Sequence, residues 1–340
     1  MMKAEEAMEM TSRPQMMTAA TIRDYGGAEA IRLERLPVPS LAADEVLVKV
    51  SATSFNPFDA KLRSGAYRHF LPLAFPFVLG VNVSGVVAAA GGETEGFQEG
   101  DRVYAFLDVT KNGASAEYVA VKAADVAFAP ESMDLRDAAA VPSVALTAWQ
   151  ALFDHAGLQP GQRVLITAAS GGVGTMAIQL AKRIGAYVIG TASSRSIPLM
   201  ERLGADETVD DRARPIAEAV DGRVDAIINL SPVGKDEVTA LLPLLKEGGT
   251  LVSAVSTADE AVAKALGVKA VRMSARRSAA QLKRIAELID AGTLRPIIAE
   301  RTRLSELSAL HRRYDEGNVT GRVVVAIDAA DRIISEGDSV

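Results

Sequence analysis

Short alternating runs of hydrophobic and polar residues dominate the chain from Thr18 to about Pro130. The segment Glu45 to Ala52 has valine at every second position, and Asp101 to Phe106 and Ala116 to Val121 are similar. Alternation with a period of two is typical of strands that bury one face. Many Gly and Pro residues separate these runs, so the pattern predicts a β-rich region of short strands and turns.

After Pro142 the pattern changes to buried strands that alternate with segments of helical period. Four segments are apolar on both faces: Arg163–Ala169, Tyr187–Ser193, Val224–Leu230 and Thr250–Val255. Such strands are typical of a parallel sheet that is covered on two sides. Between the first two, apolar residues recur at helical spacing up to Ile184, and Gly185 is expected to end that helix. The pattern predicts a doubly wound α/β domain.

The end of the chain indicates how the two regions are joined. Leu282 to Ile289 is expected to be the last helix of the α/β domain, and Gly321 to Ile327 returns to strand character. The simplest α/β architecture inserts a doubly wound domain, residues 142–290, into a β-rich domain formed by residues 17–141 and 291–340. Residues 1–16 carry three glutamates, unlike a signal or transit peptide, and are expected to form a disordered extension.

The composition excludes several classes of protein. The 340 residues include no cysteine and 3 histidines, which excludes disulfide scaffolds, thiol nucleophiles and thiolate metal sites. There are 37 Lys and Arg against 43 Asp and Glu, a net charge of −6 without a basic run, so neither nucleic acid nor a membrane is an expected partner. Apolar runs are shorter than the ~20 residues of a membrane-spanning helix. We expect a soluble, cytoplasmic protein.

The most specific motif lies between the first buried strand and the helix that follows it. Ala169 to Gly174 is the dinucleotide fingerprint G-x-G-x-x-G with its first glycine replaced by alanine. The second glycine lets the backbone approach a pyrophosphate, the third allows close helix–strand packing, and the N–H groups at the helix start bind phosphate. The expected phosphate contacts are Ser170, Gly171, Gly172, Val173 and Gly174. A glycine-rich connector without a ligand is the alternative, but the required strand and helix are both predicted.

The end of the second buried strand indicates which dinucleotide binds. Proteins that bind NAD place Asp or Glu there, on the ribose 2′-hydroxyl. This sequence has Ser193, Ser194 and Arg195, and hydroxyls with a guanidinium suit the additional phosphate of NADP. The serines could also cap the next helix, which Pro198 helps to start, and both roles can hold together. We expect NADP(H) rather than NAD(H).

Five further segments complete a recognisable layout: Asn56–Tyr67, Phe75–Val87, Gly100–Phe106, Pro142–Leu152 and Leu203–Asp206. Together with the glycine loop they resemble the medium-chain dehydrogenase/reductase superfamily, and more narrowly its zinc-free, zeta-crystallin-like quinone oxidoreductase branch. The resemblance implies a GroES-like β-rich catalytic domain with an inserted Rossmann domain, and commonly a homodimer. Lys269 to Ala275 is the expected edge strand through which two Rossmann sheets would pair.

The sequence departs from zinc-dependent members of this superfamily at the metal ligands. Those relatives have a cysteine near the position of Ser54 and a Gly-His-Glu motif where this chain has Gly80-Val81-Asn82. The three histidines lie in different predicted elements: His69, His155 and His311. An open zinc site takes three ligands from Cys, His and carboxylate, so we expect no catalytic zinc, with a zinc alcohol dehydrogenase as a weaker alternative. An aromatic residue near Lys61 and a tyrosine near Asp211, frequent in quinone oxidoreductases, are absent.

Without zinc to polarise an alcohol, hydride transfer from NADPH to a quinone or an α,β-unsaturated carbonyl is the favoured reaction. Asn56 is the first candidate for orienting the acceptor carbonyl, with an Asx-turn before Pro57 as the alternative. Tyr67 is a candidate donor of a hydrogen bond or proton, with packing at a core edge as the alternative. Lys61 and Arg63 are expected to be ordinary solvated charges. A non-catalytic NADPH-binding protein of the crystallin or adaptor kind is the alternative function.

Four further residues are candidates for contacts with the cofactor. The resemblance implies that Thr147 lies at a helix start beside the nicotinamide, with helix capping as the alternative. Asn229 and Val255 end parallel strands at the carboxyl edge of the sheet, where ligands bind. Relatives with a basic residue at the position of Arg322 place it near the cofactor, and a solvated surface arginine is the alternative.

Overall fold

The computed structural model describes residues 14–328, which divide into two compact units. Unit 1 contains residues 14–126, Arg301–Val319 and 324–328, and unit 2 contains Ala127–Glu300 and Thr320–Val323. Unit 2 thus begins at Ala127 rather than at residue 142, because the segment before α4 (Pro142–Trp149) is tied to α10 (Ala279–Asp290): the backbone N–H of Ser132 donates to Asp290 at 2.8 Å. Residues 1–13 of the expected extension lie outside the described residues.

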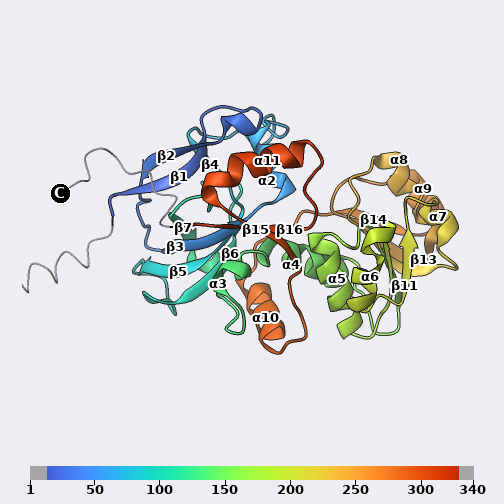
Figure 1. Ribbon diagram of the computed structural model, residues 1–340. Helices are drawn as coiled ribbons and strands as arrows, with labels where there is room; N and C mark the ends of the chain where they lie inside the picture. Colours follow the sequence, from blue (N-terminus) through green and yellow to red (C-terminus); the bar gives the residue numbers. More distant parts are fainter. Residues whose placement is uncertain (1–13, 329–340) are drawn as a thin grey trace, which may run out of the picture. The chain divides into compact units, whose positions relative to one another are not determined.

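Unit 1 holds most of the residues of two β-sheets (Figure 1). The larger has the order β15-β16-β3-β5-β6-β8, with β7 also paired to β3, and the smaller has the order β2-β1-β4. The larger sheet consists of β3 (Glu45–Ser54), β5 (Asn82–Ala90), β6 (Arg102–Phe106), β7 (Tyr118–Lys122), β8 (Val126–Phe128), β15 (Ile298–Arg303) and β16 (Arg322–Ala326). The smaller consists of β1 (Met16–Ile22), β2 (Arg32–Pro37) and β4 (Phe77–Val78), so Met16 belongs to a strand and not to the expected extension.

The valine alternation of β3 forms part of the core of unit 1. Val46, Val48 and Val50 are buried in one cluster, while Leu47, on the other face of the strand, packs in the cluster that includes β1. Antiparallel pairing with β5 places Val48 opposite Val87, which is buried in the same cluster as Val48. The predicted β-rich character of this region is confirmed. Two helices accompany the sheets, α2 (Pro57–Arg63) and α11 (Leu307–Asp315).

Unit 2 contains a parallel sheet of six strands in the order β11-β10-β9-β12-β13-β14. This is the strand order of a Rossmann fold, in which ligands bind beyond the carboxyl ends of the strands. The strands are β9 (Arg163–Ile166), β10 (Tyr187–Ala192), β11 (Glu207–Asp210), β12 (Val224–Asn229), β13 (Leu245–Ser253) and β14 (Lys269–Arg272). The four predicted buried strands are β9, β10, β12 and β13, and the sheet has β14 at its edge.

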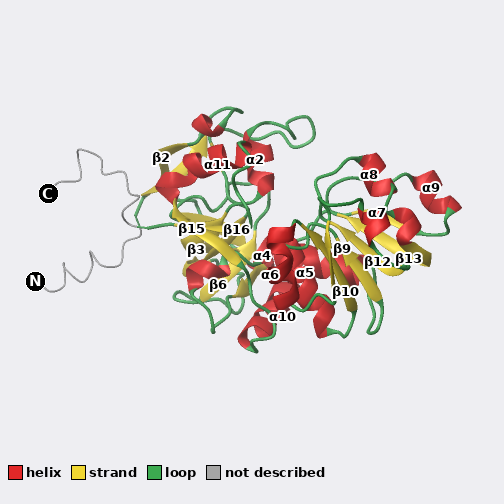
Figure 2. Cartoon of the chain, turned by 45° about the vertical axis from the view of Figure 1, so that its right-hand side comes forward, coloured by secondary structure: helices red, strands yellow, loops and turns green. Residues whose placement is uncertain are grey.

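Helices cover both faces of this sheet (Figure 2). The helices of unit 2 are α3 (Leu135–Ala138), α4 (Pro142–Trp149), α5 (Gly172–Arg183), α6 (Ile197–Arg202), α7 (Ile216–Ala219), α8 (Lys235–Thr239), α9 (Glu260–Ala265) and α10. Helix α5 buries Ala177, Leu180 and Ala181, and Gly185 follows its end with φ of +80°, as the sequence predicts. No helix within residues 14–328 combines the length and apolar character needed to span a membrane.

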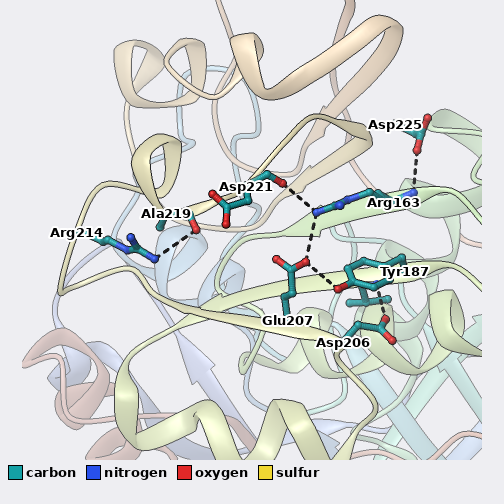
Figure 3. A network of polar contacts seen from close by, with 9 residues as sticks. Arg163, Tyr187, Asp206, Glu207, Arg214, Ala219, Asp221 and Asp225 are labelled. Carbon is teal, nitrogen blue, oxygen red and sulfur yellow. Dashed lines mark hydrogen bonds and ion pairs between the residues drawn. The ribbon is translucent and has the colours of Figure 1, made fainter.

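A polar network joins the amino ends of the four neighbouring strands β11, β10, β9 and β12 (Figure 3). The hydroxyl of Tyr187 donates to Glu207 at 2.7 Å, and this hydrogen bond raises the pKa of the tyrosine. The guanidinium of Arg163 lies over the Tyr187 ring and also contacts Glu207, while the Arg163 backbone N–H donates to Asp225 at 2.8 Å. The carboxylate of Asp225 in turn accepts from Lys246. Side-chain contacts therefore hold the amino ends of these strands together. The loops described next follow the carboxyl ends.

Candidate functional site

The loop between β9 and α5 presents unused backbone donors. Gly171 is the N-cap of α5, so no side chain caps this helix, and the first turn contains no acidic residue. Intrahelical bonding begins with the N–H of Thr175, which donates to Gly171, so the N–H groups of the preceding turn have no partner within the helix. The positive end of the helix dipole adds to these donors. The arrangement suits a phosphate group.

Different physical constraints act on the two glycines at positions 171 and 174 of this loop. A methyl group at Gly174 would lie 2.5 Å from the Cα and carbonyl oxygen of Ala169, so helix–strand packing excludes any side chain there. A methyl group at Gly171 would meet only the carbonyl oxygen of Ala168, at 3.3 Å, and the φ of Gly171 is an ordinary −74°. Packing within the protein therefore explains Gly174 but not Gly171, and close approach of a ligand to the backbone explains the latter.

The missing first glycine of the fingerprint is accommodated by a neighbouring strand. Ala169 is fully buried, and Gly190 of β10 lies against it: a methyl group at Gly190 would be 3.2 Å from the Ala169 Cβ. The preceding residue, Ala168, has φ of +47° and is the one non-glycine residue with positive φ in the described part of the chain. Such strain persists where the surrounding structure enforces it, commonly at binding sites.

The end of β10 carries no acidic residue and three polar ones. Ser194 and Arg195 are exposed, Ser193 is half-buried, and neither Ser193 nor Ser196 caps the following helical turns with its side chain. The capping alternative is therefore not realised for Ser193. One carboxylate lies nearby that the sequence did not reveal: Asp211, after β11, accepts from the Thr191 hydroxyl at 3.1 Å.

Hydrogen bonds between side chains join the carboxyl ends of β9, β12 and β13. The hydroxyl of Thr167 donates to Oδ1 of Asn229 at 2.8 Å, and Nδ2 of Asn229 donates to Oγ of Ser253 at 3.1 Å. All three side chains are buried. The backbone N–H of Val255 donates to the same Ser253 hydroxyl at 3.3 Å. Asn229 therefore acts as a positioning residue, because its carboxamide holds the ends of neighbouring strands.

Arg322 lies next to the phosphate loop within unit 2. It is 5% exposed, so the surface alternative is wrong. Its Nε donates to the carbonyl oxygen of Ala140 at 3.1 Å and Nη2 contacts the Ser143 hydroxyl at 3.3 Å, at the start of α4. A methyl group at Gly172 would be 3.6 Å from its Cδ. Arg322 thus brings a positive charge to the starts of α4 and α5.

The structure corrects the placement of Thr147. The sequence places it at a helix start, but α4 begins at Pro142 and Thr147 lies in its interior. The Thr147 hydroxyl donates to the carbonyl oxygen of Ser143 at 2.7 Å, a bond to the preceding turn that is typical of threonine within helices, so Thr147 does not cap the helix.

In unit 1, Asn56 is the N-cap of α2. Its Oδ1 accepts from the Phe58 N–H at 2.9 Å, and Asp59 accepts from the Asn56 N–H at 3.1 Å, which completes a capping box. The alternative local role of Asn56 is therefore realised. The cap uses the acceptor atom of the carboxamide, while the predicted role uses the Nδ2 donor.

Tyr67 belongs to a row of aromatic rings that begins at Phe58 in α2 and continues on the loop after this helix. Its ring centroid lies 5.2 Å from that of Phe58 and 5.0 Å from that of Phe70, which is 72% exposed. The ammonium group of Lys61 lies 5.8 Å from the Tyr67 centroid. Tyr67 therefore packs against other rings, as the alternative role predicts in part. The aromatic residue expected near Lys61 is absent from the adjacent sequence, but the folded chain places the Tyr67 ring beside Lys61.

Tyr25 fixes both ends of the loop that carries this row. Gly65, with φ of +73°, packs under the Tyr25 ring, where a methyl group would be 2.9 Å from Cγ. At the other end, the Leu73 N–H donates to the Tyr25 hydroxyl at 2.9 Å. The loop is anchored while Phe70 stays exposed.

Arg63 is not the solvated charge that the sequence predicts. It is 2% exposed, and Nη2 donates to both carboxylate oxygens of Asp315 at 2.8 Å. Burial, and to a lesser extent the charge of Arg63, lowers the pKa of the neighbouring His311 from 6.5 to about 3. The ion pair, between buried Arg63 and exposed Asp315, joins α2 to α11, a contact across 252 positions that no local pattern encodes.

The residues at the expected positions of the metal ligands do not fit zinc. Ser54, Val81 and Asn82 are buried and supply neither thiolate nor imidazole. His311 is buried in unit 1, while His69 and His155 are exposed in different units. Within residues 14–328, no three side chains of His, Cys, Asp or Glu lie close enough together to hold a metal ion.

Comparisons with known proteins agree with this architecture. Residues 42–131 match the family model for the alcohol dehydrogenase GroES-like domain, and residues 203–325 match the model described as zinc-binding dehydrogenase. The chain is 33% identical to the mitochondrial NAD(P)H oxidoreductase RTN4IP1 of Mus musculus, over 93% of this chain and 91% of that protein. It is 31% identical to the 2-methylene-furan-3-one reductase of Solanum lycopersicum, over 95% of this chain and 82% of that protein.

The solved structures lead to the same family. The quinone oxidoreductase from Coxiella burnetii superimposes with a TM-score of 0.84 at 31% identity, covering 92% of this chain and all of that one. The fold and the glycine loop define a medium-chain dehydrogenase/reductase. Within that superfamily, the chain belongs to the quinone oxidoreductase branch and is an oxidoreductase that uses a nicotinamide cofactor.

Proposed function

We propose that this protein is an NADPH-dependent reductase of quinones or α,β-unsaturated carbonyls that works without a metal. The observation that carries the proposal is the loop after β10, where Ser194 and Arg195 are exposed and no carboxylate occupies the position that selects the ribose hydroxyl of NAD. Two hydroxyls and a guanidinium match a 2′-phosphate in charge and hydrogen bonding.

Unit 2 supplies the residues that would hold the dinucleotide. The N–H groups at the start of α5 bind the pyrophosphate, and the buried charge of Arg322 beside Gly172 adds attraction for it. Asn229, by holding Ser253, fixes the loop that starts at Val255. Thr147 of α4 would lie on the nicotinamide side of a bound cofactor. Ser193, Ser194 and Arg195 read the 2′-phosphate.

Bound NADPH would supply a hydride, which an electron-poor carbon accepts without prior polarisation by a metal. The protein's task is then to orient the acceptor and to stabilise the oxygen on which charge develops. Asn56 donates to that oxygen from Nδ2 while its Oδ1 stays in the helix cap. The Tyr67 hydroxyl, or water, returns a proton, so that hydride and proton together reduce the acceptor by two electrons.

The aromatic row of Phe58, Tyr67 and Phe70 supports a flat, conjugated acceptor. Ring spacings of 5.2 and 5.0 Å and the exposure of Phe70 leave aromatic surface available for stacking. Two relatives are named after acceptors of this kind: one is a quinone oxidoreductase and the other a furanone reductase. The absence of zinc is supported by Ser54, Val81 and Asn82 at the expected ligand positions.

The proposal is tested by mixing purified protein with NADPH and a panel of ortho-quinones and short enones while the absorbance of reduced nicotinamide is followed. We expect consumption of NADPH with at least one acceptor. The alternative, a non-catalytic NADPH-binding protein, is favoured if NADPH binds but no acceptor in the panel is turned over. Metal content by elemental analysis and activity after chelation separate the proposal from a zinc alcohol dehydrogenase.

We also propose a homodimer in the cytoplasm. Strand β14 pairs with β13 on one side, and the other side of β14 is the edge of the six-stranded sheet. Edge strands present backbone donors and acceptors that a second copy can pair with around a two-fold axis. Light scattering on the purified chain gives the mass in solution, and a monomer at all concentrations would contradict the proposed assembly.

A further inference from the structure

We propose that unit 2 carries a second anion site, for a compact polyphosphate, at the end of α5 opposite the dinucleotide loop. A hollow of about 540 Å³ opens there. Eight residues line it: Gln179, Lys182, Arg183, Arg202, Leu203, Gly292, Thr293 and Arg295. They come from the end of α5, the end of α6 and the turn after α10. A volume of this size is typical of small-molecule sites.

The lining concentrates positive charge in a protein whose net charge is −6. Four of the eight residues are cations and none is acidic. Lys182 is paired with Asp206 at 2.7 Å. The guanidinium groups of Arg183, Arg202 and Arg295 are exposed and have no hydrogen-bond or ion-pair partner among residues 14–328. Three guanidinium groups without counter-charge around one hollow attract an anion with several negative charges.

Hydrogen bonding to the last carbonyls of helices, one ordinary role of basic residues at these positions, does not occupy the arginine side chains. The helix ends are already capped by backbone groups of the following turns. The N–H of Gly185 donates to Lys182, that of Gly204 to Glu201, and that of Gly292 to Ile289, at 2.9, 2.9 and 2.8 Å. The arginine side chains donate to none of these carbonyls, so their donors remain available for a ligand.

The wall of the hollow is held in place without using the arginine side chains. The carboxamide of Gln179 donates to the carbonyl oxygen of Arg295 at 3.0 Å and accepts from its N–H at 3.1 Å, which fixes the turn after α10 to α5. Lys182 also donates to the carbonyl oxygen of Ala186 at 3.2 Å, and its stem packs against Gly204. A fixed backbone lowers the ordering cost of binding to the surrounding side chains.

The lining also indicates what kind of anion fits. It contains no aromatic residue and a single large apolar one, Leu203, so there is no platform on which a nucleobase could stack. Recognition must rest on charge and on guanidinium–phosphate hydrogen bonds, which favours a compact polyphosphate over a dinucleotide. On α5 the lining begins at Gln179, about 10 Å along the helix axis from Gly172 of the dinucleotide loop at ~1.5 Å per residue. Both ligands can therefore bind together.

The test is a calorimetric titration of the full chain with inorganic tripolyphosphate, with and without saturating NADPH. The site variant is Arg183→Gln, Arg202→Gln and Arg295→Gln together. The matched control removes three exposed charges elsewhere in unit 2, by Arg214→Gln, Arg223→Gln and Lys283→Gln. We expect one site per chain that persists with NADPH, weakens by at least about tenfold in the site variant and changes by less than about twofold in the control.

Several outcomes would overturn the proposal. They are no saturable binding to the wild-type chain, equal weakening in both variants, and displacement of tripolyphosphate by NADPH. Stronger binding of poly-glutamate than of tripolyphosphate would assign the hollow to an acidic protein segment instead. Equal thermal melting of the wild-type and variant chains checks that the exposed substitutions leave the fold intact. Because the wild-type titration with NADPH present is a readout in itself, the proposal stays testable if the site variant misfolds.

Discussion

The hydroxyl of Thr167, just beyond β9, donates to Oδ1 of Asn229 at the end of β12, at 2.8 Å. The same hydroxyl accepts from the backbone N–H of Leu230 at 2.9 Å. This turns Nδ2 of Asn229 toward Ser253 on β13, so the carboxyl ends of neighbouring strands are held in one arrangement before any ligand arrives. Preorganisation of this kind reduces the cost of binding.

Replacing Asn229 tests this preorganisation. Asn229→Ala leaves the buried hydroxyls of Thr167 and Ser253 without their partner, which we expect to cost about 1–3 kcal/mol of unfolding free energy. NADPH affinity should also fall, because the loop at Val255 loses its anchor. Urea unfolding and fluorescence titration measure the two effects. Asn318→Ala, exposed and far along the chain, is the control, and an Asn229 variant with wild-type stability and affinity would contradict the account.

Alanine substitutions at two glycines of the phosphate loop should affect different properties, protein stability in one case and NADPH affinity in the other. Gly174→Ala forces a methyl group to 2.5 Å from the Ala169 backbone, so we expect a loss of more than about 3 kcal/mol of stability or failure to fold. Gly171→Ala has ordinary φ and space within the protein, so stability should change by less than about 1 kcal/mol. The Gly171 variant should nevertheless bind NADPH at least about tenfold more weakly, since ~1.4 kcal/mol corresponds to a factor of ten. Undiminished binding would show that no ligand approaches that backbone.

Arg195 should discriminate between the two nicotinamide dinucleotides. Arg195→Ala removes the guanidinium and should weaken NADPH by about ten- to a hundredfold, within the 1.5–3 kcal/mol of a charge-assisted hydrogen bond, while NADH changes little. Arg195→Lys keeps the charge and should recover part of the loss. Dissociation constants for both cofactors give the comparison, and equal weakening of both would show that the 2′-phosphate is not read at this position.

Asn56 allows its structural and proposed catalytic roles to be separated. Serine caps helices about as well as asparagine, so Asn56→Ser should leave stability within about 1 kcal/mol of wild type. The variant lacks the carboxamide donor, and we expect kcat/KM with a quinone or enone to fall by about ten- to a hundredfold. Tyr67→Phe keeps the aromatic row but removes the hydroxyl. An Asn56→Ser enzyme with full activity would confine Asn56 to the helix cap.

His311 makes stability depend on pH in a defined window. Its pKa falls from 6.5 in the unfolded chain to about 3 in the folded chain, so the unfolded state binds the proton between these values. The contribution of His311 to the free energy of unfolding is complete above pH 6.5 and decreases as the pH falls toward 3. From pH 7 to pH 4.5 the loss from this group should be about 2.7 kcal/mol, at ~1.36 kcal/mol per unit. His311→Leu should abolish that part of the loss in urea unfolding, whereas His69→Leu, at an exposed site, should retain it.

Local patterns predicted most of the fold. The alternation in β3 and the doubly apolar strands β9, β10, β12 and β13 are set by which faces each strand buries, and that information lies within each segment. Strand β11 (Glu207–Asp210) was missed because it is short and polar, and of its residues only Val209 is buried. Its place at the sheet edge comes from pairing with β10, which no local pattern reports.

The residues of the candidate site also fall into those that a local pattern predicts and those that depend on contacts between distant segments. The phosphate loop was predictable because its chemistry needs particular residues at adjacent positions. The ion pair of Arg63 and Asp315, and the contact of Asp211 with Thr191, depend on chain segments that folding brings together, so no local pattern indicates them. Thr147 was misplaced because its position at a helix start was taken from the family resemblance, whereas Pro142, of a residue type favoured at the first helical position, begins α4 five residues earlier.

The most direct test of the proposed function is kcat/KM for one quinone acceptor, measured with NADPH and with NADH on protein freed of metal by chelation. The account predicts turnover that survives chelation, with NADPH favoured by at least about tenfold, a difference of ~1.4 kcal/mol. Loss of activity with the metal, equal use of both cofactors, or no turnover at all would contradict it.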